Sequence, residues 1–289
     1  MQRNQRQSID RRDFIGLTAV GAVTAAGFLN DAHAAKRPVI AFNSANLVAR
    51  VTDYHYKLMN WMGQHAKTVA ATDAAAWRAI CREIAATGFK AVEVWEAHAS
   101  PDKLDRTKAQ EWRKILDDAG LKAVAYAGRL SQQTAEICQV LGIPHIDGGL
   151  GALNPEQATA LCKATGIRCN IENHPEKSAD ELIKKIGGGN EWLGICIDMG
   201  WLGTQGVSGP DVIKACGPLV RHTHVKDVKK SGAHETCLLG EGVANVVGCL
   251  QALKAIKYQG AYSWEDEPED RNPFESAKRN REWIERHVG

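Results

Sequence analysis

The segment DAAAWRAICREIAATGFKAVEVW at residues 73–95 contains one complete repeat of the fold. Its first part has the amphipathic pattern of a helix, begins at a capping Thr72 or Asp73, and stops before Gly88; glycine often follows the end of a helix. The short apolar run 91–95 then has the length and composition of a buried strand. The segment therefore predicts a helix that leads directly into a strand.

The same alternation of short apolar runs and amphipathic stretches extends along the chain in both directions. The predicted strands lie at 39–42, 91–95, 123–126, 145–147, 168–172, 193–198, 220–226 and 261–265. The predicted helices lie near 73–87, 107–119, 131–141, 155–165, 178–187, 209–216, 243–256 and 275–287. Strands that alternate with helices form a parallel sheet connected by crossover helices. The sequence therefore indicates an α/β protein.

Chain length and the first connection decide between a closed barrel and an open sheet. Eight repeats within residues 35–289 match the usual size of a (β/α)8 TIM barrel, about 250 residues. An open doubly wound sheet usually has a Gly-rich phosphate turn after its first strand, whereas Asn-Ser-Ala-Asn-Leu follows here at 43–47. We therefore expect a single-domain TIM barrel. Its loop 43–72 is unusually long, and loops of this length usually form or cover a site.

The first 34 residues have the three parts of a secretory signal peptide. A twin arginine at Arg11-Arg12 precedes an apolar run from Leu17 to Leu29, and Ala32-His33-Ala34 provides small residues for cleavage. The apolar run is shorter than the about 20 residues that span a bilayer. We therefore expect a twin-arginine signal peptide at 1–34, export to the periplasm, and no stable membrane anchor.

Charge and cysteine content narrow the class of protein further. The chain has 36 Lys and Arg against 34 Asp and Glu and no basic run, so it lacks the electrostatic pattern of a nucleic-acid-binding protein. Its eight cysteines are scattered, without a CxxC pair or metal-ligand spacing. Since a core of this size needs no disulfide framework, we expect buried thiols.

Four consecutive predicted strands end in residues that bind metals. Glu172, Asp198, His224 and Glu265 lie at the ends of the fifth to eighth strands, and the carboxyl ends of barrel strands form the active site of this fold. Three carboxylates in one pocket would repel one another and force protonation, which a divalent cation prevents. The set of three oxygens and one nitrogen favours Mn²⁺, Mg²⁺ or Co²⁺, with Zn²⁺ also compatible. Taken alone, each of these residues could instead cap a neighbouring helix or form an ion pair.

Five further residues are candidates for substrate binding. His174 and Lys226 each lie two residues beyond a predicted metal ligand, on the same face of the chain. Glu93 and His98 belong to the second strand and its loop. For both we favour a role in supporting the site over direct participation in the reaction. Trp201 offers an apolar face on which a sugar ring can stack. The alternatives are loop capping for His174 and ordinary barrel packing for the tryptophan.

Several motifs in fixed order resemble a known family, the xylose isomerase-like barrels, in the branch of sugar and sugar phosphate isomerases and epimerases that includes the ketose 3-epimerases. The motifs are GFKAVEVW at 88–95, IENHP at 171–175, ICID at 195–198, HVKD at 224–227, LGEGVANV at 239–246 and GAYSWEDE at 260–267. The resemblance implies that Glu172, Asp198, His224 and Glu265 hold the metal. It also implies that Glu172 and Glu265 are the acid/base pair on opposite faces of the substrate. Many relatives have a histidine where this chain has Trp201.

The predicted function is therefore that of a metal-dependent sugar isomerase or epimerase. Removal of a proton beside a carbonyl gives an enediolate, and return of the proton to the same or the neighbouring carbon gives epimerisation or isomerisation. Two alternatives stay open: a periplasmic lyase or epimerase of 3-keto-glycosides, and a non-catalytic sugar-binding barrel. The expected partner is a small carbohydrate, and the sequence leaves self-association into a homo-oligomer open.

Overall fold

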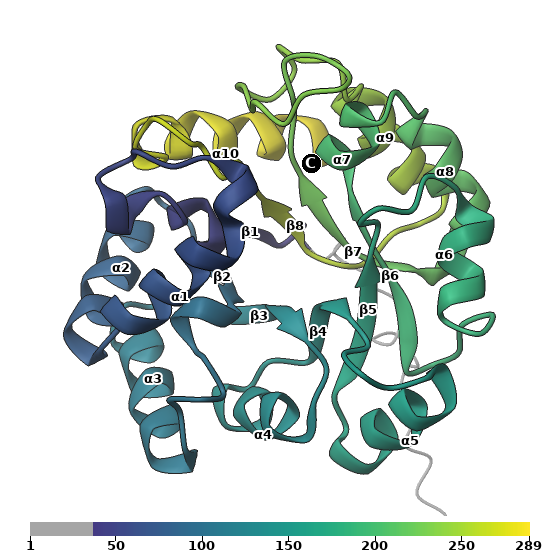
Figure 1. Ribbon diagram of the computed structural model, residues 1–289. Coiled ribbons are helices and arrows are strands. Elements are labelled where there is room, and N and C mark those ends of the chain that lie inside the picture. The colour runs from purple at the N-terminus through teal and green to yellow at the C-terminus, as the bar shows by residue number, and fades with distance from the viewer. Residues whose placement is uncertain (1–36) are drawn as a thin grey trace, which may run out of the picture. The chain divides into compact units, whose positions relative to one another are not determined.

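Eight parallel strands close into a barrel in the computed structural model, which describes residues 37–289 (Figure 1). The strands are β1 Ile40–Asn43, β2 Ala91–Trp95, β3 Lys122–Arg129, β4 His145–Gly149, β5 Arg168–Glu172, β6 Leu193–Asp198, β7 Val220–Val225 and β8 Tyr262–Trp264. Each strand pairs with the next, and β8 pairs with β1. The predicted single-domain TIM barrel is confirmed over these residues. The predicted signal peptide, 1–34, lies outside them.

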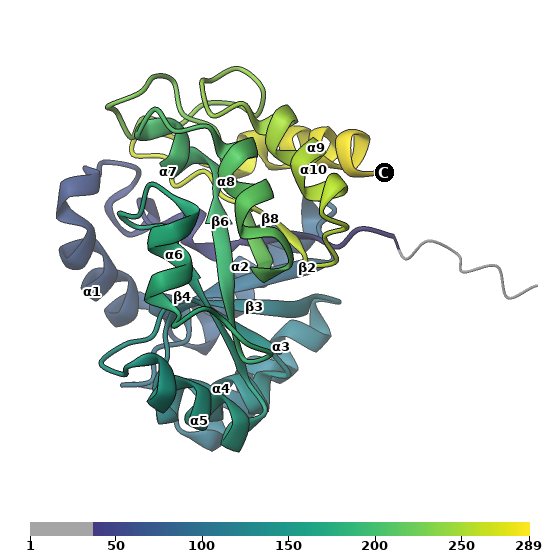
Figure 2. The same cartoon turned by 90° about the vertical axis from the view of Figure 1, so that its right-hand side faces the viewer.

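Helices surround the barrel and connect its strands (Figure 2). They are α1 Trp61–Ala71, α2 Ala74–Ala86, α3 Arg106–Asp118, α4 Gln132–Leu141, α5 Pro155–Thr165, α6 Ala179–Lys185, α7 Met199–Thr204, α8 Gly209–Cys216, α9 Val246–Ala255 and α10 Phe274–Val288. Eight of them match the predicted helices, whereas α1 and α7 were not predicted. Within residues 37–289, no helix combines the length and apolar character needed to cross a membrane.

Local capping explains where most helices begin. Asp73 accepts a hydrogen bond from the backbone N–H of Ala76, and Asn154 forms a capping box with Gln157. Ser208 precedes α8, but its side chain makes no capping hydrogen bond. Pro210 lies in the first turn of that helix, where its fixed backbone angle favours a helical start.

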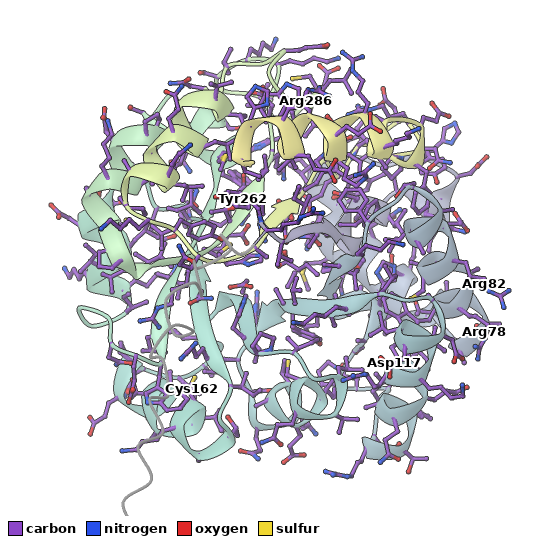
Figure 3. All side chains as sticks on the ribbon, turned by 180° about the vertical axis from the view of Figure 1, so that it is seen from behind. Arg78, Arg82, Asp117, Cys162, Tyr262 and Arg286 are labelled. Carbon is purple, nitrogen blue, oxygen red and sulfur yellow. The ribbon has the colours of Figure 1, made fainter. Side chains whose placement is uncertain are left out.

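An aromatic cluster packs between the barrel and α10. The Phe42 ring lies 5.5 Å from Phe89, 5.3 Å from Trp264 and 5.5 Å from Phe274, measured between ring centroids. Phe42, Phe89 and Trp264 are buried. Figure 3 shows the side chains from behind, with Arg78 and Arg82 at the outer edge of the molecule. The cluster therefore joins the first strand, the last strand and the last helix.

We expect Phe42→Ala to lower the free energy of unfolding by about 3–5 kcal/mol, because it removes a buried ring and leaves a cavity among three other rings. Urea unfolding followed by circular dichroism measures the change. Phe42→Leu, which retains most of the buried volume, is the matched variant and should lose less. A loss below 1 kcal/mol for Phe42→Ala would show that the cluster rearranges to fill the space.

The cysteines contribute to the apolar core rather than to a disulfide framework. All eight are free thiols, and all except Cys237 are buried. Burial raises the pKa of Cys138 and Cys169 well above the usual thiol value, because a thiolate loses hydration there. These thiols are therefore protonated and unreactive at neutral pH.

The interior of the barrel is unusually polar. Branched apolar residues normally fill this space, but here it contains buried polar side chains from six strands. They are Asn43, Glu93, Asp147, Asn170, His222, His224 and Ser263. Buried polar groups are costly unless they find partners. The strands consequently carry a connected polar network inside the barrel. The part of this network at the carboxyl ends of the strands forms the candidate site.

Candidate metal centre

Glu172, Asp198, His224 and Glu265 meet at the carboxyl end of the barrel. Glu172 and Asp198 end β5 and β6, His224 lies in β7, and Glu265 directly follows β8. One ligand atom from each lies within 4.8 Å of the others. His224 Nδ1 is 2.6 Å from Glu172 Oε1 and 3.3 Å from Glu265 Oε2. The four residues that the sequence placed at one rim are thus adjacent in space.

Asp198 has one oxygen with a structural partner and one without. Its Oδ1 accepts from the backbone N–H of Trp201 at the start of α7, while the Asn173 amide bonds to both the N–H and the carbonyl of Asp198. These contacts fix the carboxylate. Its Oδ2 is buried and has no hydrogen-bond partner in the described part of the chain. Burial raises the pKa of Asp198 to about 7.

Glu265 stays ionised although it is buried. Burial alone would raise its pKa, but the positive charges of His224 and Lys226 outweigh this effect and lower the pKa to about 2. Asn43 Nδ2 also donates to Glu265 Oε1 at 2.8 Å. A charged carboxylate therefore lies 3.3 Å from His224 Nδ1, the nitrogen that Glu172 also contacts.

The arrangement fits a divalent cation. Three carboxylates and one imidazole supply the three oxygens and one nitrogen that such an ion binds. The buried Asp198 Oδ2, which accepts no hydrogen bond from the described residues, is an oxygen that a cation would satisfy. The close approach of Glu172 and Glu265 to His224 Nδ1 brings the remaining donor atoms to one point. These four residues could hold one divalent metal ion.

Glu93 lies beneath this centre and sets the orientation of His224. Glu93 Oε1 is 3.0 Å from His224 Nε2, and Glu93 Oε2 is 2.8 Å from His222 Nε2. Because Nε2 faces Glu93, Nδ1 is the nitrogen that His224 presents to a metal. A carboxylate in this position fixes the tautomer and ring plane of a ligating histidine.

We expect Glu93→Gln to weaken metal binding about 10- to 100-fold, the usual cost of losing the carboxylate behind a ligating histidine. The dissociation constant for Mn²⁺, measured by competition with a chelator, checks this. Glu111→Gln, on the exposed face of α3, should leave the constant unchanged. Equal constants for the two variants would show that Glu93 does not act through His224.

His174, Trp201 and Lys226 lie beside the four residues. His174 Nδ1 is 3.4 Å from Glu172 Oε2 and its Nε2 is 3.5 Å from Asp198 Oδ2. The Trp201 ring lies 4.2 Å from the His174 ring, centroid to centroid. Lys226 Nζ is 3.3 Å from Glu265 Oε2. A pocket next to the centre has walls from Trp201 and Lys226 together with Leu58, Thr236, Glu267 and Glu269.

His98 does not reach the centre. Its ring packs near Trp77 and Trp95, with centroid separations of 5.9 and 5.4 Å, and its Nδ1 is 3.1 Å from Ser44 Oγ. Burial lowers the pKa of His98 to about 3, so the imidazole is neutral. In this structure His98 joins the first loop to the second strand.

Three residues of the site were missed by the sequence reasoning. Asn43 contacts Glu265, Glu267 pairs with Lys226 at 2.5 Å, and His234 packs on Trp201 with ring centroids 4.6 Å apart. Asn43 directly follows a predicted strand. The criterion that selected the candidate metal ligands, a polar residue at the end of a predicted strand, therefore applies to Asn43 as well. His234 belongs to an irregular loop without a sequence pattern that marks its position.

Comparisons with known proteins agree with this architecture. A family model described as xylose isomerase-like TIM barrel matches residues 81–287. None of the curated proteins matches the chain. A xylose isomerase-like TIM barrel protein from Mycobacterium smegmatis, in complex with magnesium, is 16% identical, with 88% of this chain and 97% of that chain covered and a TM-score of 0.65. D-allulose 3-epimerase from Methylomonas sp. is 14% identical, with coverage of 87% and 98% and a TM-score of 0.62. The IOLI protein with a bound zinc atom is 14% identical, with coverage of 86% and 98% and a TM-score of 0.60.

Proposed function

The chain belongs to the family of xylose isomerase-like TIM barrels, and on this basis we propose that it is a divalent-metal-dependent enzyme that isomerises or epimerises a sugar beside a carbonyl group. The observation that carries the proposal is the convergence of Glu172, Asp198, His224 and Glu265, with one buried carboxylate oxygen left without a partner. Sugar 3-epimerases among the structural neighbours support the class of reaction.

Glu172 and Glu265 are suited to move the proton. Both lie next to His224 Nδ1, and the proposal places a substrate so that its opposite faces meet the two carboxylates. One removes the proton beside the carbonyl and leaves an enediolate, and the other returns a proton. Return to the same carbon from the opposite face inverts it, and return to the neighbouring carbon moves the carbonyl. A cation bound at the centre would stabilise the negative charge that develops on the substrate.

Neighbouring side chains are placed to hold the sugar. The side chain of Glu172 is 14% exposed, so the centre is accessible to solvent. Lys226 can donate to a substrate oxygen, His174 can bond a hydroxyl, and Trp201 offers an aromatic face for the ring.

The donor set favours Mn²⁺, Mg²⁺ or Co²⁺, and Zn²⁺ is compatible with it. Structural neighbours contain magnesium in one case and zinc in another. Metal analysis of protein purified without chelators identifies the ion. Less than about a tenth of an equivalent of any divalent ion would contradict the proposed centre.

Export is proposed on the sequence alone. Residues 1–34, with the twin arginine and the small residues before the expected cleavage point, are proposed to direct the protein to the periplasm. Mass spectrometry of the periplasmic protein should find a chain that begins near residue 35. Retention of Met1 on periplasmic protein would contradict cleavage.

Deuterium exchange tests the proposed reaction. Free keto sugars and 3-keto-glycosides are incubated with metal-loaded protein in D₂O, and NMR follows deuterium at the carbons beside the carbonyl. Exchange that disappears with EDTA supports the proposal and identifies the carbon. Exchange or bond cleavage only with 3-keto-glycosides would favour a periplasmic lyase or epimerase of such substrates. Binding of sugars without any exchange would favour a non-catalytic barrel.

A further inference from the structure

A second cluster of potential ligands lies inside the barrel, on the amino-terminal side of the metal centre. His145 and Asp147 come from β4, and His222 comes from β7, two residues before His224. One donor atom from each of the three lies within 4.8 Å of the others. Asp147 Oδ2 is 2.8 Å from His145 Nδ1 and 3.8 Å from His222 Nε2. The proposed proton transfer uses none of these residues.

The free atoms of this cluster suit a bound cation. The His222 side chain is completely buried, and its Nδ1 has no partner among the described residues. Its Nε2 already contacts Glu93 Oε2 at 2.8 Å and Ser263 Oγ at 3.0 Å. Nδ1 is therefore the ring nitrogen that remains for a ligand.

Asn170 adds a further unsatisfied atom at the same level of the barrel. Its Nδ2 donates to Asp147 Oδ1 at 2.7 Å and lies 3.4 Å from His145 Nδ1. Its Oδ1 is buried and has no partner in the described part of the chain. Buried polar atoms without partners are uncommon in proteins, and here Asn170 and His222 each have one.

We propose that His145, Asp147 and His222 hold a second divalent cation, separate from the catalytic centre and structural in role. Two imidazole nitrogens and one carboxylate oxygen favour Zn²⁺ over Mg²⁺ or Mn²⁺. The His145 side chain is 15% exposed, which gives this cluster its contact with solvent. A bound cation would fix His222, which contacts Glu93, and Glu93 in turn orients His224.

Metal counting on the full chain tests this site. Metal-free protein is loaded with Zn²⁺, excess ion is removed with a weak chelator, and native mass spectrometry counts the bound ions. We expect two equivalents for the unchanged protein, one for His145→Gln and one for Asp198→Asn. His287→Gln, which changes an exposed histidine of α10, should still bind two.

Folding of the variants is checked independently of activity. His145→Gln reloaded with one equivalent of Mn²⁺ should still give the electron paramagnetic resonance signal of the upper centre. Asp147→Asn, which preserves the shape of the side chain, should reproduce the count of one. The proposal is overturned if the unchanged protein binds a single ion that Asp198→Asn abolishes, or if both lower-site variants still bind two. Neither result bears on the proton chemistry, which the deuterium exchange tests separately.

Discussion

Replacement of Glu265 by glutamine should lower the rate of deuterium exchange into the substrate by roughly 10³-fold. A positioned acid or base contributes about 10²- to 10⁴-fold to such a reaction, and the neutral amide cannot accept the proton. Glu265 is ionised because His224 and Lys226 lower its pKa to about 2. The substitution therefore removes a full charge from the centre. Single-turnover exchange in D₂O at saturating metal measures the loss of proton transfer apart from any loss of metal affinity.

The fold should survive this substitution. Glutamine has nearly the same shape, Asn43 can still donate to the amide oxygen, and Lys226 retains Glu267 as a partner at 2.5 Å. Glu235→Gln is the matched control, because Glu235 is exposed and pairs only with Lys229. We expect full exchange activity in that control. Activity above a tenth of the unchanged value in Glu265→Gln would exclude Glu265 as a group that moves the proton.

Removal of the divalent ion should abolish exchange and also lower thermal stability. An ion present at 100 times its dissociation constant stabilises the folded state by about 2.7 kcal/mol. In a domain of this size that corresponds to roughly 5–11 °C in Tm. The structural reason is the crowding of three carboxylates around His224, with Asp198 Oδ2 left without a partner. Differential scanning calorimetry after EDTA treatment and gel filtration measures the shift.

Adding the metal back distinguishes loss of the ion from damage by the chelator. Added Mn²⁺ should return both the exchange rate and Tm to their starting values. Asp198→Asn should show only a small rise in Tm when Mn²⁺ is added. The substitution weakens one ligand but keeps the oxygen that accepts a hydrogen bond from the start of α7. An unchanged exchange rate in fully metal-free protein would refute metal-dependent chemistry at this site.

The candidate metal ligands could be predicted because the fold places the carboxyl ends of all strands at one rim. Once the repeats at 73–95 and onward indicate parallel strands, residues at the ends of β5 to β8 must be neighbours. The positions of Glu172, Asp198, His224 and Glu265 at successive strand ends therefore predict that they lie close together. The helix α7 was missed because it is only six residues long and directly follows Asp198, a candidate metal ligand that also acts as its N-cap.

The lower cluster could not be predicted in the same way. His145 begins its strand, and His222 lies in the middle of another, so neither occupies a strand end where function is expected. The contact of His222 with Asp147 across the barrel depends on the closure of the sheet and on which face of each strand points inward. Sequence periodicity gives the alternation of faces, but it does not tell which face is inside.

The sequence by itself therefore determined the repeat, the closed barrel and the set of four residues at its rim, because apolar periodicity and strand ends are local properties of the chain. The tertiary structure alone decided that Glu93 orients His224, that His98 packs away from the centre, and that Asp147 meets two histidines inside the barrel. Apart from the pair His145 and Asp147 within β4, these contacts join residues far apart in sequence. Their geometry depends on the register of eight strands, which no local pattern encodes.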